Sequence, residues 1–509
     1  MGDTEANEQA AADPATTTAK AASPVLNRRT VLAAATAAGV GVAAARLVAW
    51  ANEPQFTPVP ITGTLGNKTG LDWVSPLASE PARVAHLLRR ATFGATQEEL
   101  QQAQSDGYTK TVDRLLETKI VEPPAFPGGD EASQEKPLNI GQLQQWWIDH
   151  MLSTPTPFGE RMTLFWHGHF TSDFRKVGAQ DPFIYWQNLT WRAYALSDLR
   201  TMLRQVTIDP AMLRYLDLAQ STGKSPNENY ARELMELFAM GPEAYTEDDV
   251  RAAAKGLAGW RLPMTQAMID ANVKRQIMQT GQAPKNVPKA DLVRTGIFEK
   301  SRAYAGPAFT FLGETKVWST DAILDKILDQ DATAPFIVRK VLTHFAMPSP
   351  ADAYVARLAS SFRRSRYDVK TLMRDVFMSP EFVAAPAYRA LIKTPTEFMV
   401  NAAKALGDKT LGRVILGSAS GMGQVLFDPP SVGGWPENES WVSSNTMLSR
   451  ANFVTAVLGA AKKLPPSGNA HQVYLDGVLS QQTLSLLNQT SDDRRRWAVV
   501  FASPEFQLK

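Results

Sequence analysis

Four polar side chains recur at helical spacing in one segment of the chain. They are an amide, a guanidinium and two carboxylates within two helical turns, from Asn229, Arg232, Glu233 and Glu236. Paired carboxylates beside an arginine are suited to acid–base catalysis on an anionic or carbonyl substrate. The same spacing also suits a solvated helix face joined by ion pairs three and four residues apart, so both interpretations stay open.

The segment that carries these residues has the features of a helix from residue 225 to 241. Ser225 and Glu228 form a capping pattern, Pro226 occupies the first helical position, and Gly241 precedes a proline that stops the helix. An apolar stripe lies opposite the polar one and consists of Tyr230, Leu234, Leu237 and Phe238. We therefore expect the rest of the chain to be organised around this helix.

Two of the six histidines, His167 and His169, are separated by one residue in the sequence W-H-G-H-F. In an extended segment both imidazoles project to the same side, where they could bind Zn, Mn or Fe. Glu233 or Glu236 could complete a site of two histidines and one carboxylate. Without a metal, the same residues could act as an acid–base pair, or the histidines could be hydrogen-bonded members of a polar core.

A loop rich in proline, glycine and tryptophan interrupts the predicted helices between residues 427 and 441. Its composition predicts a rigid backbone that presents Trp435 and Trp441. Exposed tryptophan rings suit sugars or flat apolar ligands, whereas buried rings fill a core. The expected ligand-binding set is completed by Arg90 and Trp260, with Arg90 and Arg232 as the positive groups that orient a substrate.

The first fifty residues resemble a twin-arginine (Tat) signal peptide. Arg28 and Arg29 precede a mildly apolar stretch over residues 33–45, and an A-x-A pattern follows at 49–51. Arg46 cuts the apolar run short of the ~20 residues that span a membrane, so we expect no stable span after cleavage. A retained anchor is the alternative. The twin-arginine translocase is thus an expected partner, and the protein is expected to be exported: periplasmic, secreted or on the cell surface.

The composition is that of a globular protein, with 44 % hydrophobic and 20 % charged residues and a net charge of +2 over 509 residues. No basic stripe alternates with aromatic residues, so we expect no nucleic-acid partner. Cysteine is absent, which excludes disulfides, thiolate nucleophiles and iron–sulfur clusters. Common motifs of serine hydrolases, zinc proteases and nucleotide-binding enzymes are also missing from the sequence.

Helical periodicity dominates the chain, and alternating strand-like runs are scarce. We expect a mainly α fold: a large multi-helix globular domain of helical hairpins, a smaller C-terminal helical part, and few or no strands. The expected divisions are a signal at 1–51, an extended linker at 52–78, an N-terminal helical domain at 79–345 and a C-terminal helical domain at 346–509 packed on it.

Two further features of the sequence bear on this organisation. Residues 263–299 are polar and weakly periodic, which predicts a mobile insertion or lid in the N-terminal domain. The sequence V-F-x-S-P-E-F at 376–382 recurs at 500–506, which indicates two related helical units.

Five segments together resemble a bacterial exported family, domain of unknown function 1800. They are residues 86–94, 166–170, 227–237, 245–260 and 427–436, and the resemblance runs from about 86 to 508. It implies an exported, mostly helical protein with an exported sulfatase-like partner, and it assigns no reaction. Where similar members carry Arg-His-Asp, this chain has Arg302-Ala303-Tyr304, so it lacks any ligand or base that this histidine supplies.

Two hypotheses follow. The first is an exported enzyme, metal-dependent or acid–base, either a hydrolase or an oxidoreductase, with its site between the two histidines, the 225–241 helix and the Trp435 loop. The second is a non-catalytic cell-envelope scaffold or binding protein in which these residues form a buried His/Glu/Arg network. An open pocket that both imidazoles face favours the enzyme, whereas side chains paired inside the protein favour the network.

Overall fold

The computed structural model describes residues 74–509, except residues 118 and 292. In this part of the chain, helices make up 59 % of the residues and strands 4 %, in two small sheets. The expected mainly α fold is therefore confirmed. The predicted export signal and most of the predicted linker lie outside the described residues. Among the helices described, none is long and apolar enough to cross a membrane.

The N-terminal part of the fold consists of short helices with polar caps. Thr96 and Glu99 form a predicted capping box, in which each side chain accepts a hydrogen bond from the other residue's backbone. The elements of this part are α3 (Glu80–Ala91), α4 (Gln97–Asp106), α5 (Tyr108–Glu117), α6 (Ile140–Ser153), α7 (Pro157–His169), α8 (Phe174–Val177), α9 (Phe183–Ala193), α10 (Leu199–Ile208), α11 (Pro210–Tyr215) and η1 (Leu218–Gln220).

The predicted helix at 225–241 begins later than expected. Ser225 lies in an isolated bridge, so its capping box with Glu228 does not form, and the helix starts at Asn229. The second half of this helix is a π-helix, and Gly241 with a φ of +86° follows it, as the predicted stop requires. The elements of this part are α12 (Asn229–Glu233), η2 (Leu234–Ala239), α13 (Glu247–Leu257), β1 (Trp260–Arg261), α14 (Gln266–Thr280), β2 (Ile297–Phe298), η3 (Lys300–Arg302), β3 (Phe309–Phe311) and β4 (Glu314–Lys316).

The two sheets are antiparallel pairs, β1 with β2 and β3 with β4. Helices alone form the rest of the fold. They are α15 (Thr320–Leu328), α16 (Thr333–Phe345), α17 (Asp352–Arg364), α18 (Val369–Phe377), η4 (Ala385–Ala387), α19 (Pro395–Ala405), η5 (Lys409–Leu411), α20 (Gly412–Met422), η6 (Asn438–Trp441), α21 (Ser444–Ala460), α22 (Ala470–Leu475), α23 (Gln481–Asn488), α24 (Asp493–Ala502) and α25 (Pro504–Gln507).

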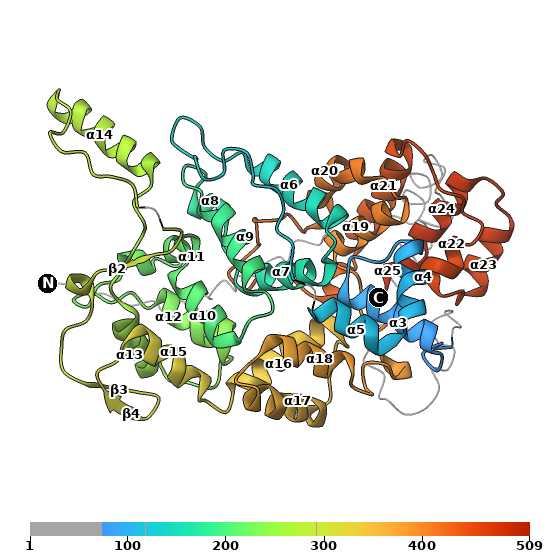
Figure 1. Ribbon diagram of the computed structural model, residues 1–509, viewed down its shortest axis with the longest axis horizontal. Helices are drawn as coiled ribbons and strands as arrows, with labels where there is room; N and C mark the ends of the chain where they lie inside the picture. Colours follow the sequence, from blue (N-terminus) through green and yellow to red (C-terminus); the bar gives the residue numbers. More distant parts are fainter. Residues whose placement is uncertain (1–73, 118, 292) are drawn as a thin grey trace, which may run out of the picture.

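Helix α7, and not the helix at 225–241, is the element at the centre of the fold (Figure 1). Every residue from Phe158 to His167 is buried, including Glu160 and Arg161. Two hydrophobic clusters meet at this helix: Phe158 and other α7 residues pack with α3–α5, α10 and α15–α18, while Leu164 packs with α6 and α19–α24. A helix buried on all sides can carry charged residues only if each of them has a partner. The division of the chain into two domains at residue 346 stays a prediction.

Residues 263–299 contain a regular helix that the weak periodicity did not predict. Thr265 caps α14 by accepting a hydrogen bond from Met268, and Gly281 with a φ of +71° ends it. The helix extends away from the other helices (Figure 1) and exposes Ile277 and Met278. Because it packs little of its surface, it has no continuous apolar stripe for a periodicity argument to detect. Its role as a lid stays a prediction.

The repeated S-P-E-F sequence forms the same local structure at both sites. Ser379 donates to the carbonyl of Val376 at 2.7 Å and Ser503 to that of Val500 at 2.8 Å. Each serine oxygen also accepts from the phenylalanine N–H three residues on, at 3.3 Å in both cases. The repeat therefore encodes one type of helix end, used after α18 and after α24.

Candidate functional site

The four residues predicted to be catalytic lie on α12 and η2 and make surface contacts. The guanidinium of Arg232 donates to both carboxylate oxygens of Glu247 on α13, at 2.6 and 2.8 Å. Asn229 donates to Asp217 at 3.3 Å, and Glu236 accepts from Tyr245 at 3.0 Å. With 34 % of the Arg232 side chain and 61 % of the Glu247 side chain exposed, this is a solvated ion pair. Glu233 is half-buried, and burial followed by the charge of Glu236 raises its pKa.

His167 and His169 lie in the last turn of α7, and not in the extended segment that was expected. Residues two apart on a helix point in different directions, about 200° around the axis. Nε2 of His167 accepts from the backbone N–H of Phe427 at 3.1 Å, and Nε2 of His169 bonds the carbonyl of Phe238 at 3.0 Å. The two imidazoles therefore face separate surroundings, one at the 427–441 loop and one at η2.

The electrostatic environment keeps both imidazoles neutral. Burial lowers the pKa of His167 to about 3, and burial together with the charge of Lys340 lowers that of His169 to about 3. In the described part of the chain, no group of three or more His, Asp or Glu side chains is placed to hold a metal ion. A metal at these two histidines stays a prediction.

The tryptophans predicted to bind a ligand occupy different places. Trp435 is half-buried, with its ring centroid 5.2 Å from that of His167, while Trp441 is buried. Within the described part of the chain, neither indole N–H has a hydrogen-bond partner. Trp260 lies in β1, where its N–H donates to Thr320 at 3.0 Å and its ring packs under Arg204. The structure thus brings Trp435 to the histidine segment, as expected, and assigns Trp260 to the packing between β1 and α15.

A first buried charge network surrounds Glu160 on α7. Its carboxylate accepts two hydrogen bonds from Arg192 on α9, both at 2.8 Å, and one from the indole N–H of Trp147 on α6. His150 on α6 lies 3.2 Å from the same carboxylate. Burial alone raises the pKa of Glu160, but the charge and hydrogen bonds of Arg192, followed by His150, outweigh it and lower the pKa to about 2. These four residues, called the Glu160 network, join α6, α7 and α9.

A second buried group, called the Glu397 cluster, collects charges from distant parts of the chain. Glu397 on α19 pairs with Arg161 on α7 and with Nζ of Lys509 at 2.6 Å. His344 on α16 lies 3.9 Å from the same carboxylate. Burial raises the pKa of Glu397, and the charges of Arg161 and Lys509 outweigh it, so the pKa lies well below its ordinary value. The carboxylate is therefore ionised at neutral pH.

Three more cations interact electrostatically with Glu397, so the cluster is rich in positive charge. They are Arg90 on α3, Lys393 before α19 and Arg450 on α21, and all three are buried. Arg90 donates to the carbonyl of Ala387 at 2.5 Å, Lys393 donates to Asn401 and to the carbonyl of Phe506, both at 2.7 Å, and Arg450 donates to Gln507 at 2.9 Å. Of the predicted ligand-binding residues, Arg90 is the one that the structure places in a charged interior site.

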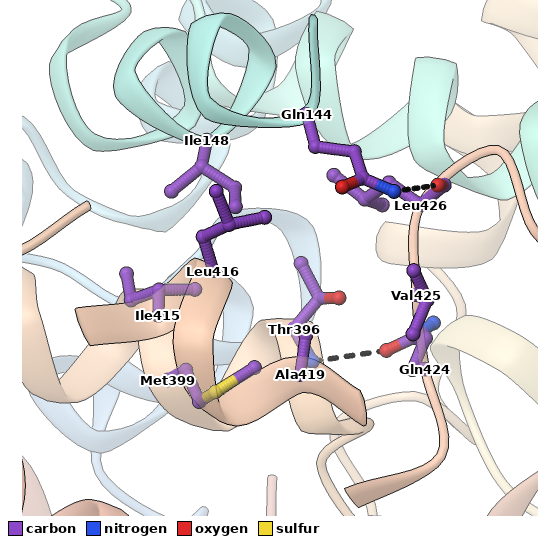
Figure 2. A pocket seen from close by; sticks show the side chains of 10 residues that line it. All are labelled: Gln144, Ile148, Thr396, Met399, Ile415, Leu416, Ala419, Gln424, Val425 and Leu426. Atoms are coloured by element: carbon purple, nitrogen blue, oxygen red, sulfur yellow. Dashed lines mark hydrogen bonds between the residues drawn. The ribbon is translucent and has the colours of Figure 1, made fainter. Parts of the chain in front are cut away.

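A small cavity lies between α6, α19 and α20 (Figure 2). Its volume of about 10 Å³ is close to the least that holds one water molecule. Apolar side chains line most of it, and its polar neighbours are already bonded: Gln144 donates to the carbonyl of Leu426 at 2.8 Å, and Gln424 accepts from the N–H of Thr396 at 2.9 Å. The cavity offers neither the room nor the free donors that a substrate needs.

Sequence reasoning missed most members of the two charged groups. A signal was present for Glu160 and Arg161, because two adjacent charges stand in a segment otherwise rich in apolar and aromatic residues. A capping box at Thr394 and Glu397 marked α19 but gave no sign that the glutamate also binds an arginine. No local pattern indicates Lys393, Arg450 or Lys509, because their partners are distant in the sequence.

Comparison with known proteins gives one match. A family model described as "Protein of unknown function (DUF1800)" matches residues 86–508. No curated protein and no solved structure matches the chain. The matched residues include both charged groups except for Lys509.

Proposed function

This chain belongs to the DUF1800 family of proteins of unknown function, and from that premise we propose that it is an exported, non-catalytic binding protein of the cell envelope. A buried His/Glu/Arg network gives the protein its shape, and the residues at its centre hold a ligand without transforming it. This is the second of the two functions that the sequence allows.

The contacts of the two histidines carry this proposal. One ring nitrogen of each imidazole is hydrogen-bonded to the backbone. His167 bonds the N–H of Phe427, and His169 bonds the carbonyl of Phe238. A pair of metal ligands needs its nitrogens directed at one shared point. Glu160, the carboxylate on the same helix as the two histidines, is already bonded to Arg192 and Trp147. These groups serve packing, which is what the scaffold or binding hypothesis requires.

One observation favours the enzyme hypothesis. The π-helix η2 carries Glu236 and follows directly on Glu233, and π-helical turns are frequent at functional sites. Against an acid–base role, Arg232 is engaged by Glu247 and Glu236 by Tyr245, both at the surface. We therefore keep the enzyme as the second candidate, with its site at η2.

Export is the other half of the proposal, and it rests on the sequence around Arg28 and Arg29. Replacement of both by lysine should abolish accumulation of the protein outside the cytoplasm, since the translocase recognises the arginine pair. Continued export of the double variant would contradict this part of the proposal.

The test of the binding function is elemental analysis of the mature protein from a host that exports it. We expect less than stoichiometric Zn, Mn and Fe, both in the wild type and in the double variant His167→Ala/His169→Ala. Stoichiometric metal in the wild type that is lost in the double variant would overturn the proposal and make the metalloenzyme the working hypothesis.

A further inference from the structure

The Glu397 cluster holds more positive charge than its neighbours compensate. Five cationic side chains interact with the one carboxylate of Glu397, and all six residues are at most 5 % exposed; the cations are Arg90, Arg161, Lys393, Arg450 and Lys509. Nearby acidic residues are engaged elsewhere: Asp476 pairs with Arg89 at 2.6 Å, and Glu505 accepts from Ser480 and Thr483. Glu437, 3.7 Å from His344, lies at the solvent edge with 42 % of its side chain exposed.

Several guanidinium donors in the cluster have no hydrogen-bond partner among the residues that the structure describes. They are Nε and Nη1 of Arg90, Nε and Nη1 of Arg161, and Nε of Arg450. These three side chains are fully buried, so solvent at the surface does not satisfy the donors. Buried N–H groups of a charged side chain are costly when left unbonded, and native proteins rarely leave them so. The guanidinium groups of Arg161 and Arg450 also lie over aromatic rings, but the five N–H donors remain available to a hydrogen-bond acceptor.

The balance of charge indicates what that acceptor is. Burial lowers the pKa of Lys393 well below its ordinary value and that of Lys509 to about 7, so both lysines can lose their protons. An arginine cannot be deprotonated in a protein. The three arginines alone outnumber the single carboxylate of Glu397, so the cluster has an excess of positive charge that a bound anion would reduce.

We propose that the Glu397 cluster is a binding site for a small oxyanion, held by the unbonded guanidinium groups of Arg90, Arg161 and Arg450. Sulfate, hydrogen phosphate and a short dicarboxylate share the required chemistry, because planar guanidinium groups bind two oxygens at once. This inference rests on the proposed binding function and names the class of its ligand. The three arginines come from α3, α7 and α21, so the anion also joins the two hydrophobic clusters.

The test is isothermal titration calorimetry of the full mature protein with sodium sulfate, sodium phosphate or sodium succinate, against sodium chloride at equal ionic strength. Binding at one site gives heat with each injection until the site is saturated. We expect a saturable heat signal at millimolar or lower concentration with at least one of the three anions and none with chloride. The anion that binds at the lowest concentration identifies which of the three chemical types the site prefers. A heat signal that never saturates reflects nonspecific association of the salt with the protein and would overturn the proposal.

Two variants are expected to change the affinity in opposite directions. Arg450→Gln removes one donor and should weaken the most effective anion about tenfold or more, since a charge-assisted contact is lost. Glu397→Gln removes the competing carboxylate and should tighten binding of the same anion about tenfold. If these residues had a merely structural role, the two substitutions would not change the anion affinity in opposite directions. Arg200→Gln, at the exposed pair with Asp325, is the matched control and should leave the affinity unchanged.

The outcomes separate this inference from the proposed function. If either variant fails to fold, the saturable response of the wild type still decides the matter. Lys393→Gln is then the second variant, and weaker binding is expected from it. Saturable anion binding by a protein that also holds stoichiometric metal would overturn the non-catalytic function and keep the anion site. Metal-free protein without a saturable response would overturn the anion site and leave the non-catalytic function standing.

Discussion

Glu160 and Arg161 are adjacent in the sequence, yet each is neutralised by a different part of the protein. Glu160 accepts from Arg192 on α9, whereas Arg161 pairs with Glu397 on α19. Helix α7 is buried on all sides, and its two charges connect it to both networks. Glu160 belongs to the Glu160 network with α6 and α9, and Arg161 belongs to the Glu397 cluster with α3, α19 and α21. The position of α7 is therefore determined by charge pairing as well as by apolar packing.

The first prediction concerns the difference between a buried and an exposed ion pair. Glu160→Gln should lower the free energy of unfolding by about 3–5 kcal/mol, because it leaves Arg192 charged and buried without a partner. Glu247→Gln breaks a pair of similar geometry at the surface and should cost no more than about 1 kcal/mol. Urea unfolding of the three proteins at pH 7.5 measures both values. Equal losses in the two variants would contradict the role assigned to the Glu160 network.

The sequence predicted the class of fold and several local features, but not the charged interior. The capping box at Thr96 and the repeated helix ends at Ser379 and Ser503 depend on neighbours within a few residues, so a single sequence is enough to find them. The start of the 225–241 helix was wrong, because Ser225 is held in a bridge instead of acting as a cap. Tertiary contacts override a local preference of this size.

The functional residues were harder to predict for a related physical reason. His167 and His169 were noticed because they are close in sequence, but the helix turns them apart. Lys393 and Arg450 were not selected, because a lysine or arginine in isolation signals a solvated surface. Only the fold shows that these side chains are buried around Glu397.

The second prediction concerns acid pH. His167 and His169 have a folded pKa of about 3, and in the unfolded chain an ordinary value near about 6.5. Between these values the unfolded chain binds protons that the native protein does not, so stability is present above about pH 6.5 and is lost as the pH falls. The loss should reach about 1.4 kcal/mol per pH unit for each histidine.

Urea unfolding at pH 7.5, 6 and 5 measures this loss, and His167→Gln provides the comparison. The glutamine oxygen can still accept from the N–H of Phe427 but does not titrate, so the variant should lose less stability on acidification. His86 and His344, whose pKa values burial also lowers, should maintain part of the slope. An identical pH dependence in wild type and variant would show that His167 takes up a proton as readily in the native state.

The third prediction concerns the contact between the 427–441 loop and α7. Gly434 has a φ of +83°, and a Cβ at this position would lie 2.2 Å from the carbonyl oxygen of Gly168. Gly434→Ala should therefore destabilise the protein by more than the about 1–3 kcal/mol that the backbone conformation alone costs. At Gly433 the nearest atom to an added Cβ, in Ser431, is 3.6 Å away, so Gly433→Ala is a neighbouring control with little expected effect. Thermal unfolding compares the two, and similar midpoints would argue against close docking of the loop.

The fourth prediction concerns a buried carboxyl group outside both charged groups. Burial raises the pKa of Asp209 to about 7, while one of its oxygens accepts from Gln187 at 2.7 Å and from the N–H of Met212 at 2.8 Å. The other oxygen has no hydrogen-bond partner. Because the native state keeps the proton better than the unfolded chain, ionisation costs stability as the pH rises from about 4 to 7.

Asp209→Asn retains the accepting oxygen and removes the charge. The variant should therefore be more stable than the wild type at pH 8, with a difference that shrinks toward pH 5. The difference between urea midpoints at the two pH values isolates this effect from other titrating groups. A variant that is less stable at both pH values would indicate that the carboxylate has a charged partner in the native protein.

The separation of Arg161 from Glu397 and Lys509 along the sequence has a consequence for biosynthesis. When α7 leaves the ribosome, the residues that will neutralise Arg161 have not yet been made, and those of α19 and the segment around residue 509 follow much later. The charge of Arg161 can therefore be neutralised within the fold only after α19 and the residues around 509 have been synthesised, so the two hydrophobic clusters are joined at this point late in synthesis.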